Sequence, residues 1–196
     1  MRKVLIVVLA FVGVCALAWT AADVPSPRAV IAPATIASDA IVIPVAGVQA
    51  DALRDNFLDA RSGHVHQALD IMAPRGTPVL AAVDGKVRKL FTSKAGGLTI
   101  YETDPVENTI YYYAHLDRYT DGLAEGQLLR RGDVIGYVGT TGNAPANSPH
   151  LHFAISILPP TKEWWKGEPV NPYPILKQRG VTRFSSEPPQ HPAGSD

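Results

Sequence analysis

Short runs of apolar residues, several of them alternating with polar residues, follow one another along the middle of this chain. Turn residues separate the runs, as is typical of β-strands with one buried face. We expect strands at 41–45, 78–83, 86–91, 98–102, 109–113, 132–139 and 150–157. Long helical periodicity is absent, and residues 50–60 have room for no more than a short helix. The pattern predicts a mainly antiparallel all-β fold with little helix.

The dipeptide Asp84-Gly85 separates the run at 78–83 from the run at 86–91. An Asp-Gly pair between two strand-like runs favours a two-residue hairpin turn. The sequence therefore predicts that these two runs pair with each other.

Histidine and aspartate side chains mark three of the segments. His150 and His152 open the last run, and alternation places both imidazoles on one face of the strand. His66 and Asp70 lie four residues apart, so an extended segment would also direct both side chains to one side. His115 lies between these two pairs along the chain. Four imidazoles and a carboxylate on strand-like runs predict a metal-competent cluster.

The first residues have the features of an export signal. Arg2 and Lys3 precede an uncharged stretch that ends in small residues, which predicts a signal peptide over 1–22. The alternative is a retained anchor, because 19 residues from Val4 to Ala22 would span about 28 Å as a helix, close to the ~30 Å membrane core. Either way we expect the remainder to be exported, and contact with the membrane only through an uncleaved anchor.

Composition divides the rest of the chain into three parts. Residues 23–40 are rich in proline and alanine and are expected to form a linker. Residues 41–180 have the size of one domain, and residues 181–196 are expected to be a disordered tail.

Charge and cysteine content limit the ligands and metal-binding groups that the chain can use. The chain has 18 basic and 18 acidic residues, without the clustered positive charge that phosphate binding requires, so we expect no nucleic-acid partner. Cys15 is the only cysteine and lies in the leader. Disulfides and thiolate zinc ligands are therefore excluded from the mature chain, and a metal must bind to histidine and carboxylate.

A catalytic zinc ion keeps three protein ligands and one open position. His66, Asp70 and one of His150 and His152 would supply three ligands for one ion per chain. The other histidine of that pair and His115 would remain as general base and as donors to the oxyanion of a tetrahedral intermediate.

These segments resemble the lysostaphin/LytM-type zinc metallopeptidases, which cleave the peptide part of peptidoglycan. The resemblance covers about residues 41–176. It is carried by His66-x-x-x-Asp70, the Ala-Pro-Arg-Gly-Thr-Pro-Val that follows, Asp84-Gly85-Lys86-Val87, Tyr113-Ala114-His115-Leu116, Gly132-Asp133-x-Ile135-Gly136, Gly139-Thr140-Thr141-Gly142 and His150-Leu151-His152-Phe153.

The resemblance implies that His66, Asp70 and His152 are the zinc ligands and that His115 and His150 are catalytic. It also implies a LytM-type β-sandwich of the barrel-sandwich hybrid kind, with the metal at the base of a groove. The implied activity is a zinc-dependent endopeptidase that hydrolyses the peptide cross-links of peptidoglycan in the periplasm or cell envelope.

Two other classes of protein share part of this pattern. Some members of the family have lost ligands and regulate cell-wall amidases, so a non-catalytic module that binds wall peptide is the alternative; here every metal and catalytic position is filled. Biotinyl and lipoyl carrier domains have a similar β architecture, but a carrier has no use for clustered histidines or an export signal.

His64 is expected to face solvent, and Trp164 and Trp165 to form a structural cap, with groove lining as the alternative for each.

Overall fold

The computed structural model describes residues 41–61 and 63–178 of the chain. The elements, in chain order, are η1 (Ala50–Ala52), β1 (Ala60–Arg61), β2 (His64–Val65), β3 (Leu69–Met72), β4 (Pro78–Leu80), β5 (Gly85–Ser93), β6 (Gly97–Thr103), β7 (Thr109–Tyr119), β8 (Leu128–Leu129), β9 (Val134–Val138), β10 (His150–Ile157), β11 (Glu168–Val170) and α1 (Pro172–Gln178). Every strand pair among these residues is antiparallel. The expected all-β class with little helix is confirmed.

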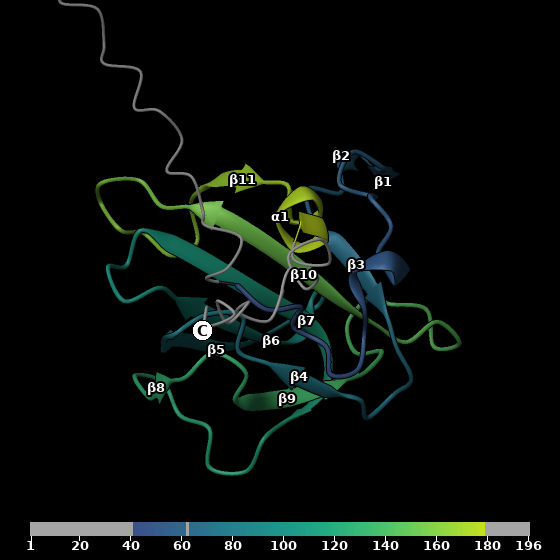
Figure 1. Ribbon diagram of the computed structural model, residues 1–196, viewed down its shortest axis with the longest axis horizontal. Coiled ribbons are helices and arrows are strands. Elements are labelled where there is room, and N and C mark those ends of the chain that lie inside the picture. Colours follow the sequence, from purple (N-terminus) through teal and green to yellow (C-terminus); the bar gives the residue numbers. More distant parts are fainter. Residues whose placement is uncertain (1–40, 62, 179–196) are drawn as a thin grey trace, which may run out of the picture. The chain divides into compact units, whose positions relative to one another are not determined.

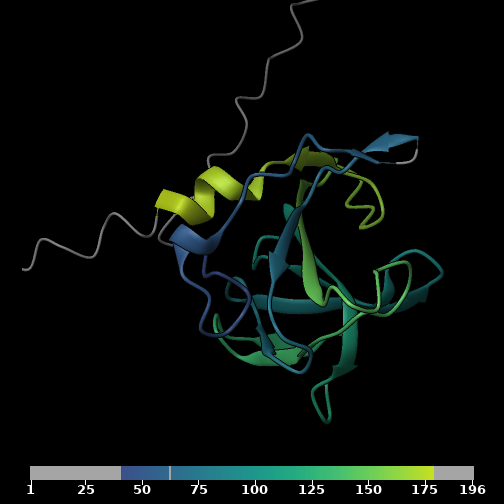
Figure 2. The same ribbon diagram turned by 90° about the vertical axis from the view of Figure 1, so that its right-hand side faces the viewer.

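Strand β7 is the centre of the main sheet, whose hydrogen-bonded order is β11-β10-β7-β6-β5-β8 (Figure 1). β3 extends the sheet beside β10, while β9 pairs with the last residues of β7 and with β4. The pairing of one long strand with three neighbours folds the sheet around a single apolar core. Figure 2 shows the same elements from the side, with η1 next to α1.

The core lies on one face of β7 and β10. Tyr113 of β7 and Phe153 of β10 are fully buried and pack with their ring centroids 5.3 Å apart. Leu151 and Ile155 lie on the same face of β10 as Phe153 and are also fully buried, each contributing about 1.5–3 kcal/mol by leaving water. The predicted alternation of the last strand is confirmed, and its other face is free to carry the two histidines.

The predicted hairpin across Asp84-Gly85 does not form. β4 pairs with β9, and β5 pairs with β6 and β8. Between the two strands the backbone N–H of Ala82 donates to the buried Oε2 of Glu102 (3.1 Å) and to the Tyr113 hydroxyl (2.8 Å). The Ala82 N–H, which a hairpin ladder would need as a donor, is therefore already bonded to these two core side chains.

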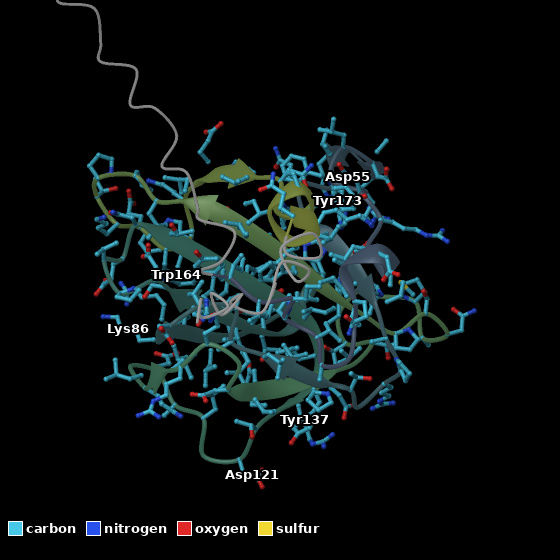
Figure 3. The ribbon with its side chains drawn as sticks, viewed as in Figure 1. Asp55, Lys86, Asp121, Tyr137, Trp164 and Tyr173 are labelled. Carbon is cyan, nitrogen blue, oxygen red and sulfur yellow. The ribbon has the colours of Figure 1, made fainter. Side chains whose placement is uncertain are left out.

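The C-terminal helix α1 was not expected, although the sequence contains its start signal. Asn171 accepts the backbone N–H of Tyr173 through Oδ1 at 2.9 Å, and Pro172 occupies the first helical position, as at many helix starts. The Asn171 amide also donates to Asp55 (3.1 and 3.2 Å), which Figure 3 draws in the same region as Tyr173. The start of α1 is thus bound to the segment that follows η1. η1 itself is the short helix expected within residues 50–60.

The leader predicted at 1–22, the linker at 23–40 and the tail at 181–196 lie outside the described residues. Within 41–61 and 63–178, no helix is long and apolar enough to cross a membrane.

Candidate metal centre

Two segments that are far apart in the sequence bring three side chains, those of His66, Asp70 and His152, to one point. Antiparallel pairing of β3 with β10 places Asp70 directly opposite His152, with Asp70 Oδ1 3.1 Å from His152 Nδ1. His66 Nε2 lies 3.0 Å from each of these two atoms. These three residues form a candidate metal-binding group.

The spacing of the three atoms fits a tetrahedral ion. Ligand atoms 2.0–2.1 Å from zinc at tetrahedral angles lie roughly 3.3 Å apart. The observed separations of 3.0 to 3.1 Å need only a small outward movement to reach that value. One carboxylate and two imidazoles are also a donor set that zinc prefers.

His66 reaches the group by a route that the sequence did not indicate. It lies in neither strand, because β2 ends at Val65 and β3 begins at Leu69, so the segment from His66 to Asp70 is not continuously extended. Gln67 has a φ of 53°, a left-handed conformation that turns the chain between the two strands. The turn, and not strand alternation, brings the His66 and Asp70 side chains together.

Residue Asn56 orients both of these side chains. His66 Nδ1 contacts the Asn56 carbonyl at 3.0 Å, and the Asn56 side chain accepts the backbone N–H of Asp70 at 3.2 Å. Because a carbonyl only accepts hydrogen bonds, Nδ1 of His66 carries the proton and Nε2 is left free for a metal.

Arg61 is a further member of the site that the sequence did not reveal. Its guanidinium donates to Asp70 Oδ2 at 2.6 Å, which leaves Oδ1 directed at the two histidines. Burial raises the pKa of Asp70, but hydrogen bonds and charge interactions with His152 and His66 outweigh it and hold the pKa far below its usual value. Asp70 is therefore ionised and ready to bind a cation.

His115 is aimed at the site by a β-bulge in β7. Tyr111 and Tyr113 point into the core, so strict alternation would bury His115 on the same face. The ladder to β6 instead pairs Leu98 with Leu116 and Ile100 with Tyr113, leaving an extra residue on β7. His115 has a φ of 63°, and its ring lies 5.5 Å from that of His152, centroid to centroid. The bulge therefore turns the imidazole out of the core.

His115 and His150 form a neighbouring pair, with ring centroids 5.0 Å apart. Nδ1 of His115 lies 2.9 Å from the Thr141 carbonyl, and Nδ1 of His150 lies 2.7 Å from the Ser148 carbonyl. Both rings therefore carry their proton on Nδ1 and keep Nε2 as an acceptor. Burial lowers the pKa of His115 to about 4, although the hydrogen bond to Thr141 opposes the shift. His115 is consequently neutral near pH 7.

The five predicted site residues line one groove of about 460 Å³. His64 is exposed to solvent, as expected, and also lines this groove. Trp164 and Trp165 are not among the lining residues. The remaining lining residues are Arg61, Ala95, Gly96, Tyr112, Ala114, Asn143, Ala144 and Pro145.

Sequence and structure comparisons agree with this geometry. Among curated proteins, the chain is 33% identical over 132 residues to an L-Ala--D-Glu endopeptidase of Bacillus subtilis, covering 63% of this chain and 39% of the relative. It is 37% identical over 133 residues to the DD-carboxypeptidase/endopeptidase Mpg of Neisseria meningitidis, covering 63% of this chain and 27% of the relative. The chain thus spans well under half the length of either protein.

Among solved structures, the catalytic domain of the antimicrobial peptidase lysostaphin from Staphylococcus simulans aligns with a TM-score of 0.51 at 30% identity, covering 59% of this chain and 82% of that domain. The family model described as Peptidase family M23 matches residues 64–172, more than half of the chain. That match includes every residue of the metal-competent group and both neighbouring histidines. By sequence, fold and site, the chain belongs to peptidase family M23.

Proposed function

We propose that this chain is a zinc-dependent endopeptidase that hydrolyses the peptide part of peptidoglycan. The observation that carries the proposal is the convergence of His66, Asp70 and His152 beside His115 and His150 in one groove. Relatives whose names describe cleavage of L-Ala--D-Glu and of DD-linked peptides support the substrate class. A non-catalytic module would not require the second pair of imidazoles.

In this proposal His66 Nε2, Asp70 Oδ1 and His152 Nδ1 would hold one zinc ion. When bound, zinc lowers the pKa of a water molecule and polarises the carbonyl of the scissile bond. Asn56 and Arg61 keep His66 and Asp70 oriented toward the ion, as partners outside the ligand shell generally do.

His115 and His150 carry the proton transfers. Each presents an unprotonated Nε2 because its Nδ1 donates to a backbone carbonyl. The low pKa of His115 keeps its imidazole unprotonated at neutral pH, so that its Nε2 can accept a proton. The protonated imidazole then donates to the oxyanion or to the leaving amine, so the two rings serve as base, acid and oxyanion donor in turn.

We also infer that the chain acts outside the cytoplasm, because its proposed substrate is the cell wall. The leader at 1–22 would direct export or remain as an anchor, and residues 41–180 would form the catalytic domain.

The proposal is tested by incubating the purified protein with isolated sacculi and identifying the released muropeptides by mass spectrometry. We expect soluble peptide-containing fragments whose masses identify the cleaved bond. Release that continues in the presence of a zinc chelator, or no release from zinc-loaded protein, would contradict the proposal.

A further inference from the structure

A series of aromatic side chains leads away from the groove along the outer face of the sheet. Tyr112 lines the groove, and its ring centroid lies 6.0 Å from that of His152. Tyr101 is paired with Tyr112 across the β6–β7 ladder, with centroids 4.7 Å apart. Trp164, from the connection between β10 and β11, packs 4.7 Å from Tyr101. The rings are thus continuous from the groove to this connection, where Figure 3 labels Trp164.

The far end of the series opens to solvent. Trp165 is 61% exposed and Phe91 is 44% exposed. Both adjoin Trp164, at centroid distances of 5.5 Å and 6.4 Å. Trp164 is partly buried by its contact with Tyr101, so core packing accounts for its position. Phe91 and Trp165 remain exposed beside it, and together they form an apolar patch at the surface.

The connection that carries the two tryptophans is fastened at several points. The backbone N–H of Leu158 donates to the Asn108 carbonyl at 2.7 Å, and Lys162 donates to the Asn108 side chain. Within the connection, Lys166 Nζ donates to Glu163 Oε1 at 2.8 Å. A surface that is ordered in advance loses little conformational entropy when a ligand binds.

We propose that Phe91, Trp164 and Trp165 form an aromatic platform that binds the glycan strand to which the substrate peptide is attached. The inference rests on the proposed function, because it takes the ligand to be peptidoglycan. Peptide and sugar are covalently joined in that polymer, so a peptide held in the groove keeps its glycan near the molecule. A surface continuous with the groove is where that glycan would lie.

The chemistry of the platform suits sugar rings. The C–H groups on a pyranose face are weakly positive, and aromatic faces carry the negative lobes of the ring quadrupole. Such stacking tolerates neutral ligands and needs no counter-charge. The indole faces also offer a large apolar area that loses its water when a ligand binds, as aromatic hot-spot residues do at protein interfaces.

The test uses glycan strands from which an amidase has removed every peptide, with binding to the full chain measured by isothermal titration calorimetry. We expect measurable binding by the wild-type protein and a loss of roughly tenfold for Trp165→Ala. Phe91→Ala, at the other exposed position, should weaken binding in the same direction, and Trp165→Phe should retain most of it. Leu128→Ala, at a position on β8 that is 80% exposed and distant in sequence from the platform, serves as the matched control.

Absence of binding by the wild-type protein would overturn the proposal. Wild-type affinity in both Trp165→Ala and Phe91→Ala would overturn it as well, and would leave the tryptophans as a structural cap. The probe contains no peptide bond, so these outcomes do not depend on zinc or on hydrolysis. Failure of the peptidase proposal would be seen separately, in the release of muropeptides from sacculi.

Discussion

Asp70 and His152 are 82 residues apart in the sequence, yet they face each other at directly paired positions of β3 and β10, with Oδ1 and Nδ1 3.1 Å apart. Backbone hydrogen bonds of the ladder therefore set the distance between the two proposed ligands. A metal site built on paired strands is more precise than one on loops, because the sheet holds both side chains in register.

We expect Asp70→Ala to abolish zinc binding and hydrolysis together. Removal of the carboxylate leaves two imidazoles without the negative charge that favours a dication, and two protein ligands hold zinc poorly. Zinc content by mass spectrometry, beside the rate of muropeptide release, checks this expectation. Asp121→Ala, at an exposed turn, should keep both properties.

Arg61 is expected to act as a positioning residue for Asp70. Without its 2.6 Å hydrogen bond to Oδ2, the carboxylate loses its fixed orientation, and loss of such a partner typically costs 10–100-fold in metal affinity. Competition with a zinc-sensitive dye should therefore show weaker binding for Arg61→Ala. The control is Arg75→Ala, because Arg75 pairs with Asp117 and not with Asp70; equal zinc affinities in the two variants would contradict the role.

The sequence predicted the residues of the site better than it predicted how the chain assembles them. His150 and His152 follow simple strand alternation, which depends only on local pattern, so their shared face was predictable. The outward direction of His115 depends on a bulge that arises from the pairing of β7 with β6. The residues next to His115 in the sequence do not indicate this pairing. His66 likewise depends on a left-handed Gln67, for which the sequence offers no turn glycine.

Long-range contacts in the core also explain where the fold predicted from the sequence was wrong. Asp84-Gly85 is a strong local hairpin signal, but Glu102 and Tyr113 bind the Ala82 N–H, and local propensity yields to this tertiary contact. The Asn171-Pro172 start of α1 was, by contrast, a local signal that could have been used.

Buried Glu102 should make folding stability depend on pH. Burial raises its pKa from 4.5 to about 8, although hydrogen bonds from Tyr113 and the Ala82 N–H oppose the shift. Between these pH values the folded state keeps a proton that the unfolded state loses. The free energy of unfolding therefore falls as the pH rises, by up to about 1.4 kcal/mol per pH unit.

Urea denaturation at pH 5, 6, 7 and 8 measures this dependence. Glu102→Gln cannot titrate, so its stability should vary less with pH than that of the wild type. Glu107→Gln is the control, since Glu107 pairs with Lys86 at the surface and has its pKa lowered by that contact. A Glu102→Gln profile parallel to the wild-type profile would show that the carboxyl is not protonated in the folded protein.

The assignment of separate roles to His152 and His150 is the central claim, and zinc content measured beside hydrolysis rate tests it most directly. His152→Ala should lose zinc and activity together, because His152 Nδ1 belongs to the converging group. His150→Ala and His115→Ala should keep zinc but slow muropeptide release by about 10²–10⁴-fold, the usual contribution of a positioned acid–base group. Zinc lost from His150→Ala but retained by His152→Ala, or full activity in His115→Ala, would contradict the account.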